Sequence, residues 1–126
     1  MVNKIKFYNN FKVSEAHKRS ILLIGNFDGL HLGHQKLLKS ANNYKKKFKL
    51  KIGIITFEPA PKMYFNKSIK NFRISNLSQK IKILKSYGID FIIIKKFNKK
   101  FSKIRSKKFI KNILYKNLKA KYIFVS

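Results

Sequence analysis

Two histidines three positions apart, His31 and His34, are the residues whose type and spacing point most directly to chemistry. They lie in a segment, residues 25–34, that reads Gly-Asn-Phe-Asp-Gly-Leu-His-Leu-Gly-His. Residues three apart share one face of a helix, so both imidazoles can reach the same ligand. A helix N-terminus attracts phosphate, because it carries unpaired N–H groups and a partial positive charge. The spacing therefore indicates electrostatic stabilisation of a polyphosphate during nucleotidyl transfer, with no covalent intermediate.

The same segment has simpler interpretations. Its glycines permit tight turns and let backbone amides approach a ligand, although a glycine-rich turn after a strand is common. Asp28 fits a turn role slightly better, because its carboxylate can accept backbone N–H groups. A zinc site is disfavoured, because the chain has no cysteine and no third ligand near the two histidines. The combination of strand, turn, two histidines and Gly33 at a helix start still favours phosphate chemistry.

The elements that position these residues alternate between strands and helices. Four apolar runs predict strands, at residues 21–24, 52–57, 90–94 and 122–125. Helical periodicity predicts helices over 32–48, from Asn76 to the residue before Gly88, and over 106–117, with a loop at 63–75. This alternation predicts an α/β fold whose parallel sheet has helices on both faces. Ligands bind beyond the carboxyl ends of such strands, so residues 26–34 and 58–61 are expected at one edge.

The apolar positions within each predicted helix indicate which side chains face the sheet. In the first helix the inward residues are Leu37, Leu38, Ala41 and Tyr44, and the residues expected in water are Lys36, Lys39, Lys45, Lys46 and Lys47. In the second they are Leu77, Ile81 and Leu84, and in the third Phe109, Ile110, Ile113 and Leu114. Asn76 and Gln79 form a possible capping box, and Gly88 suits the positive φ that follows a helix.

Length and composition set the class of protein. The 126 residues correspond to one domain, and a hydrophobic content of 44% suits a packed core. The apolar runs are far shorter than a membrane span, and the first twenty residues hold no apolar stretch of the kind a secretory signal requires. We therefore expect a soluble, cytoplasmic chain.

The charge is strongly positive, with 31 Lys and Arg against four acidic residues and a formal net charge of +27. Such a balance attracts polyanions and leaves a nucleic-acid-binding domain open as an alternative. Only Arg19, Arg73 and Arg105 are arginines, however, and the lysines are spread along the chain. We therefore favour a solvated lysine surface, with no nucleic-acid partner, over a nucleic-acid footprint.

The glycine-rich segment resembles the signature of the HxGH nucleotidyltransferases, through Gly25-x-Phe27-Asp28-Gly29-x-His31-x-Gly33-His34. Within that superfamily, the segment resembles the FMN adenylyltransferase (FAD synthetase) module of bacterial bifunctional riboflavin kinase/FAD synthetases, because Asn26 precedes Phe27 and Gly29 follows Asp28. The similarity continues through Thr56-Phe57-Glu58-Pro59-x-Pro61 with Phe65, through Arg73-Ile74 and on to Phe109. It covers nearly the whole chain after about residue 20.

The resemblance implies a Rossmann-like three-layer α/β/α fold and transfer of AMP from ATP to FMN, giving FAD and pyrophosphate. It implies that His31 and His34 are catalytic and contact the ATP phosphates, with Mg²⁺ bridging phosphate oxygens. The residues that it places in the ATP and phosphate loop are Gly25, Asn26, Phe27, Asp28, Gly29 and Gly33. Those placed near the flavin are Pro59, Pro61 and Phe65, although the prolines could simply end a strand and Phe65 could be a core residue.

Two departures from the family pattern matter. Ala60 stands where the family usually has His between the two prolines, which removes a polar group from the flavin side. The chain also stops at Ser126, so we expect residues 1–126 to be one incomplete adenylyltransferase domain. It would lack the last strand or strands and the riboflavin kinase domain, and turnover would require the missing segment. Transfer to another phosphate-bearing acceptor is a further alternative.

Overall fold

The computed structural model describes residues 4–25, 32–58, 77–96, 98–99 and 103–126. Five parallel strands form one sheet in the order β1-β4-β3-β2-β5. The strands are β1 (Lys6–Tyr8), β2 (Ile21–Ile24), β3 (Ile52–Glu58), β4 (Phe91–Lys96) and β5 (Tyr122–Val125). Four of these confirm the strands predicted from the apolar runs, to within one or two residues at the ends.

Strand β1 is an element that the sequence pattern did not reveal. It has only three residues, and Lys6 and Phe7 are exposed, so no apolar alternation marks it. It is held by parallel pairing with β4 and by the backbone N–H of Lys6, which donates to Asp90 O at 3.1 Å. Pairing with a distant strand, which a local pattern does not report, decides its conformation.

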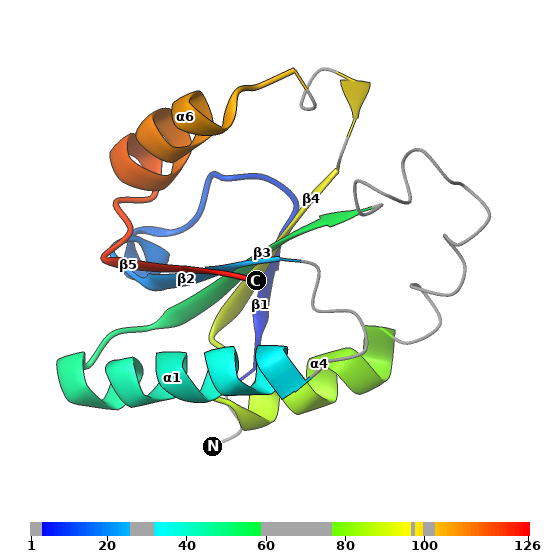
Figure 1. Cartoon of the computed structure of the whole chain (residues 1–126), viewed down its shortest axis with the longest axis vertical. Coiled ribbons are helices and arrows are strands. Elements are labelled where there is room, and N and C mark those ends of the chain that lie inside the picture. The colour runs from blue at the N-terminus through cyan, green and yellow to red at the C-terminus, as the bar shows by residue number, and fades with distance from the viewer. Residues whose placement is uncertain (1–3, 26–31, 59–76, 97, 100–102) are drawn as a thin grey trace.

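Helices cover both faces of the sheet (Figure 1). On one face lie α1 (Leu32–Phe48) and α4 (Leu77–Ser86), and on the other lie α6 (Ser106–Lys108) and η4 (Phe109–Asn117), which continue one another. A short helix, η1 (Glu15–His17), precedes β2. The three-layer α/β/α architecture is therefore confirmed. The predicted capping box, the side chains of Leu77 and Ile81 and the loop at 63–75 lie outside the part whose side chains are described.

Alternate residues of the buried strands contribute to two hydrophobic clusters, one on each face. The cluster beneath α1 and α4 consists of Ile21, Leu23, Leu38, Ala41, Ile52, Ile54, Leu84, Ile89 and Ile92. The cluster beneath η4 consists of Phe11, Val13, Leu22, Ile55, Phe91, Ile93, Leu114 and Leu118. The inward placement of Leu38, Ala41 and Leu84 is as predicted, with Leu37 partly buried against the same core and Tyr44 at its margin, 38% exposed.

Gly53 explains how the sheet holds Phe91, a fully buried aromatic side chain. Gly53 pairs with Phe91 across β3 and β4, and a Cβ built on Gly53 would lie 2.1 Å from the Phe91 ring. Only glycine leaves room for that ring at this position. His17 stacks on the same ring, at a centroid distance of 4.5 Å and an interplanar angle of 20°.

The third predicted helix is correct in extent but wrong in one inward residue. Residues Phe109–Asn117 form a π-helix, whose i→i+5 hydrogen bonds place more residues in each turn than an α-helix does. Leu114 is buried at 1% exposure, and Phe109 and Ile113 pack partly against the core, but Ile110 is 54% exposed. The wider turn rotates Ile110 away from the sheet and brings Leu118 into the core instead.

Lys45 is also placed differently from the prediction that it faces water. Its Nζ donates to Asp90 Oδ2 at 2.8 Å and to the carbonyl of Gly88 at 2.6 Å. Asp90 Oδ2 also accepts the backbone N–H of Ile52 at 2.8 Å. Gly88 has the predicted positive φ, 81°. This Lys45–Asp90 clasp ties the end of α1 to the starts of β3 and β4.

Candidate functional site

The carboxyl ends of β2 and β3 lie side by side, as the α/β alternation predicted. Ile24 pairs with Ile55, and the backbone N–H of Gly25 donates to Ile55 O at 3.1 Å. Strand β5 runs parallel to β2 on its other side, with Val125 opposite Ile24. The chain therefore leaves β2 at Gly25 on the sheet edge where ligands bind in open parallel sheets.

His34 is the third residue of α1, in the first turn of that helix. Its imidazole is half-buried, and Nδ1 has no contact with solvent. The helix starts at Leu32, eight positions after the end of β2 at Ile24, and has no acidic side chain in its first turn. A helix N-terminus without acidic side chains nearby can interact favourably with an anion through its N–H groups and its dipole. These features suit a phosphate-binding position for His34.

The other predicted residues of the site are distributed between described and undescribed segments. Gly25 is half-buried at the end of β2, and Gly33 belongs to the first turn of α1. Outside the described residues lie Asn26, Phe27, Asp28, Gly29 and His31, and with them the predicted flavin residues Pro59, Pro61 and Phe65. The approach of His31 to His34 and the contacts of the flavin side therefore stay predictions.

Two lysines on the same edge were not singled out from the sequence. Lys95 and Lys96 end β4, where they pair with Phe57 and Glu58 at the end of β3. Lys95 is half-buried with its Nζ 5.7 Å from the centroid of the Phe11 ring, and Lys96 is exposed. The sequence feature that could have identified them is the change from an apolar run to two lysines at the end of a strand. Lysine is so abundant in this chain that this change does not stand out.

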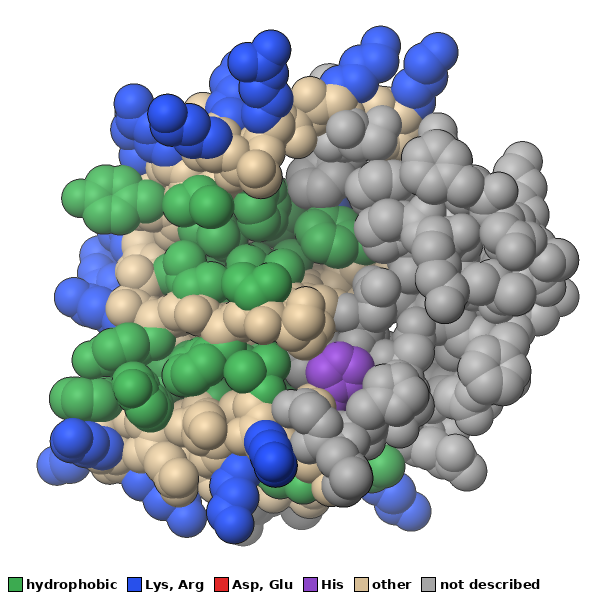
Figure 2. Space-filling model, viewed as in Figure 1, with side chains coloured by type: hydrophobic (Ala, Val, Ile, Leu, Met, Phe, Trp, Pro, Cys, Tyr) green, Lys and Arg blue, Asp and Glu red, His purple; other side chains and the backbone are tan. Residues whose placement is uncertain are grey.

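The positive charge on the face that carries β5 and α1 lies around its margin. Figure 2 shows Lys and Arg side chains around the margin of the face that carries β5 and α1, with hydrophobic side chains between them. Within the described part of the chain, no group of three His, Cys, Asp or Glu side chains could hold a metal ion. Among those same residues, no helix is long and apolar enough to cross a membrane.

Comparison with known proteins identifies the family. The family model described as FAD synthetase matches residues 13–126. The bifunctional riboflavin kinase/FMN adenylyltransferase of Buchnera aphidicola from Acyrthosiphon pisum is 40% identical over 113 residues, 90% of this chain and 36% of that protein. The protein of the same name from Escherichia coli K12 is 32% identical over 105 residues, 83% of this chain and 34% of that protein.

A solved structure has a similar fold. It is titled as a macrolide-efflux protein from Streptococcus pneumoniae, with a TM-score of 0.77 and 27% identity over 94% of this chain and 40% of that one. The chain spans little more than a third of the length of the curated relatives that it matches, for example 36% of the Buchnera protein. Because the family model extends over residues 13–126, almost all of the described fold, the chain belongs to the FAD synthetase family.

Proposed function

We propose that this chain supplies the adenylyltransferase part of an enzyme that transfers AMP from ATP to FMN, forming FAD and pyrophosphate. The proposal rests on one observation above all: the FAD synthetase match includes a β2–α1 junction with His34 in the first turn of the helix. The names of the curated relatives include FMN adenylyltransferase, which supports FMN as the acceptor.

In this proposal the residues of the chain act by binding and charge stabilisation. The triphosphate of ATP lies at the N-terminus of α1, where His34 and His31 donate hydrogen bonds to oxygens of the α- and β-phosphates. An oxygen of the FMN phosphate attacks the α-phosphorus, and the bond to the bridging oxygen of the leaving pyrophosphate breaks. Negative charge increases on the phosphate oxygens during this step, so donors fixed beforehand lower the barrier.

In this proposal Mg²⁺ is brought to the site by ATP. Among the described residues no three potential metal ligands come together, and Mg²⁺ commonly relies on substrate phosphates and water for much of its coordination. When bound to ATP it would neutralise charge on the phosphate oxygens. The proposal therefore assigns no metal ligand among the residues that the structure describes.

The flavin side of the proposal depends on Pro59, Pro61 and Phe65, which follow the end of β3. Two stiff prolines and an aromatic ring could form an apolar surface for the flavin ring system. Ala60 offers no polar group there, so binding would depend on ring packing and on the FMN phosphate. The field of Lys95, Lys96 and the wider lysine surface would help to concentrate both anionic substrates. A cytoplasmic location remains part of the proposal.

The test is ATP binding and FAD formation by matched variants. His34→Ala should weaken Mg²⁺–ATP binding on the order of tenfold or more, because hydrogen bonds to charged groups contribute about 1.5–3 kcal/mol. Asn43→Ala, a neutral change at an exposed position farther along α1, should leave the affinity unchanged. Isothermal titration calorimetry measures both affinities, and chromatography detects FAD.

The same experiment separates the alternatives. A panel of phosphate-bearing acceptors in place of FMN would reveal a different acceptor, and preference for another acceptor would contradict the flavin assignment. A nucleic-acid-binding domain would instead bind DNA or RNA with an affinity that falls steeply with salt and does not change in His34→Ala. That result, together with unaltered ATP binding in His34→Ala, would overturn the proposal.

A further inference from the structure

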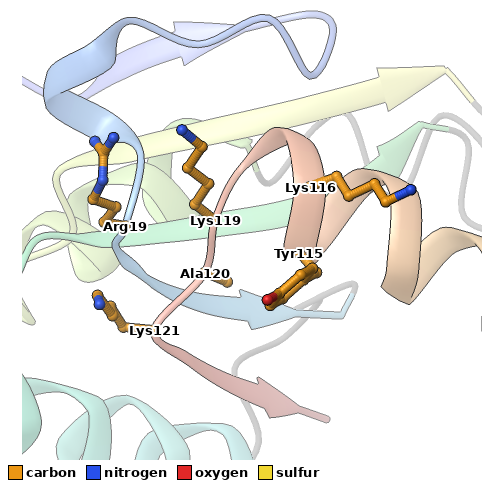
Figure 3. Close-up of a pocket in the computed structure, with 6 residues that line it drawn as sticks. All are labelled: Arg19, Tyr115, Lys116, Lys119, Ala120 and Lys121. Atoms are coloured by element: carbon orange, nitrogen blue, oxygen red, sulfur yellow. The ribbon is translucent and has the colours of Figure 1, made fainter.

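A second concave site lies at the opposite end of β2 from His34. It is a hollow of about 440 Å³ lined by Arg19, Tyr115, Lys116, Lys119, Ala120 and Lys121 (Figure 3). Arg19 lies just before β2, and Ala120 and Lys121 lie just before β5. Because β2 and β5 are parallel, the hollow lies at their amino ends, whereas Gly25 and His34 lie beyond the carboxyl end of β2. The proposed nucleotidyl-transfer site does not include it.

The backbone around this hollow is tied together. The N–H of Arg19 donates to Leu118 O at 3.0 Å, and the N–H of Lys121 donates to Ser20 O at 2.9 Å. Ser20 and Leu118 are both buried, each with 2% of its surface exposed. These bonds fasten the segment before β2 to the segment between η4 and β5. The side chains of the lining thus project from a well-supported backbone.

Two cationic residues of the lining have backbone conformations that favour glycine or asparagine. Arg19 has a φ of 61° and Lys119 a φ of 54°. Left-handed backbone at a non-glycine residue costs free energy, and such residues persist where the surroundings or a function require them. The turn itself does not require Arg or Lys at these two positions, because Gly or Asn would adopt the same conformation with less strain. Lys49 has the same conformation outside the hollow, so this conformation does not by itself mark a binding site, and the proposal rests on the charges and the ring of the lining.

The charges and the aromatic ring in the lining are complementary to a particular ligand chemistry. Arg19, Lys119 and Lys121 are cationic, and none of the described residues lining the hollow is acidic. Glu15, which is not among the lining residues, accepts a hydrogen bond from Arg19 Nη2 at 3.1 Å, so one guanidinium nitrogen is engaged. The Tyr115 ring is 72% exposed and extends from η4 toward Ala120 and Lys121, whereas Lys116 extends away from them (Figure 3).

We propose that this hollow binds a phosphate-bearing ligand with a planar ring. The phosphate contacts Arg19 and Lys119, whose side chains extend in the same direction (Figure 3), and the ring stacks on Tyr115. Arg and Lys bind phosphate through charge-assisted hydrogen bonds, and bases stack on exposed aromatic rings. A volume of about 440 Å³ lies within the range of small-molecule sites. A mononucleotide and a single-stranded nucleic acid share this chemistry, and the experiment distinguishes them.

The experiment uses Lys119→Asn and a matched control, Lys49→Asn. Lys49 also has a φ of 54°, follows α1 and is exposed, and it does not line the hollow. Both substitutions remove one positive charge and place Asn in a left-handed conformation, so neither should lower the thermal midpoint. AMP, inorganic pyrophosphate and a short single-stranded oligothymidylate are titrated into each protein, and amide NMR shifts report where they bind.

The expected result is saturable shifts at residues 115–121 and at Arg19. Lys119→Asn should weaken AMP binding there by roughly tenfold and Lys49→Asn should not, because Lys119, unlike Lys49, donates a charge-assisted bond to the phosphate. Tyr115→Ala should weaken AMP but leave pyrophosphate binding unchanged, since pyrophosphate has no ring. Saturation by AMP identifies a mononucleotide as a sufficient ligand, whereas saturation by the oligonucleotide alone identifies a nucleic acid.

Three outcomes would overturn the proposal. Equal losses in Lys119→Asn and Lys49→Asn would show that only the net charge of the protein matters. Equal losses of AMP and pyrophosphate binding in Tyr115→Ala would refute the stacked ring. The absence of saturable shifts at Arg19 and residues 115–121 with all three probes would refute the site itself. His34 does not line the hollow, so His34→Ala should leave the AMP shifts at Arg19 and residues 115–121 unchanged, and the two proposals can fail separately.

Discussion

At the scale of single residues, Lys45 and Asp90 show how one long-range pair connects three elements. They are 45 positions apart in the chain, and their side chains are 28% and 24% exposed. Because Asp90 also accepts the N–H of Ile52, its carboxylate links β3, β4 and α1. A partly buried pair with such bonds contributes more to stability than an exposed surface pair does.

The first prediction concerns this clasp. Lys45→Met should lower the free energy of unfolding by about 1–3 kcal/mol, because Asp90 and the Gly88 carbonyl both lose a donor. Lys46→Met, at the neighbouring exposed position, should change it by less than about 0.5 kcal/mol. Urea denaturation measures both. Equal effects of the two substitutions would mean that Lys45 contributes only through the net charge.

The second prediction concerns His17, whose Nδ1 is 2.7 Å from the Tyr8 hydroxyl. Burial lowers the pKa of His17 below the usual 6.5, and the positive charges of Lys51 and Lys6 lower it further, while Asp90 opposes them. The folded protein therefore favours the neutral imidazole. The stabilisation from His17 is fully present above the unfolded pKa and is lost as pH falls through the folded pKa.

Unfolding free energies measured by urea at several pH values between about 7.5 and 5 test this prediction. The stability of the protein should decrease as pH falls through that window, and His17→Gln should show a smaller decrease, because Gln does not titrate. The comparison between the two proteins removes the contributions of His31, His34 and the carboxylates. An identical slope in His17→Gln would contradict the assignment.

At the scale of elements, the π-helix η4 decides which side chains of residues 109–117 reach the core. An α-helical spacing and a π-helical spacing place Ile110 differently relative to Leu114, and the structure has Leu114 buried and Ile110 largely exposed. The backbone N–H of Leu118 donates to Ile113 O at 2.9 Å, an i→i−5 bond that continues the wider spacing. Leu118 thereby joins the core at the start of the turn that leads to β5.

The third prediction follows from this spacing. Leu114→Ala should cost about 2–5 kcal/mol of stability, because it leaves a cavity under the helix. Ile110→Ala should cost less than about 1 kcal/mol, because more than half of its surface, 54%, is already exposed. Thermal or urea unfolding compares the two. A large loss in Ile110→Ala would indicate that the segment is an ordinary α-helix with Ile110 turned inward.

At the scale of the whole molecule, the charge of +27 acts on stability as well as on binding. Only three ion pairs join described side chains, and two of them share the single carboxylate of Glu15. Most cations are therefore not compensated by an ion pair within the described part of the chain. Mutual repulsion among cations opposes the compact state and is screened by salt.

The fourth prediction is an increase in the thermal midpoint when sodium chloride is raised from about 0.01 M to about 0.15 M, which shortens the Debye length from about 30 Å to about 8 Å. Sucrose at matched osmolality serves as the uncharged control, since it does not screen charge. A midpoint that is unchanged or falls with salt would show that repulsion among the lysines does not limit stability.

The sequence by itself was sufficient to predict the order of strands and helices from β2 onward, the parallel sheet with helices on both faces, and the edge that carries His34. These depend on short-range periodicity and on the fixed rule that parallel strands share their carboxyl ends. The paired histidines were recognisable because His31, Gly33 and His34 lie next to the predicted start of a helix in the chain. The same short-range information was enough for the family resemblance.

Only the tertiary structure decided which distant residues meet. It paired Lys45 with Asp90, added β1 to β4, turned Ile110 outward and brought Arg19 beside Lys119 and Lys121. Periodicity reports whether a residue is buried on its own element, but contacts between elements depend on strand order and helix register. In a chain with 31 cations, composition also cannot distinguish a lysine that pairs with a carboxylate from one that faces water.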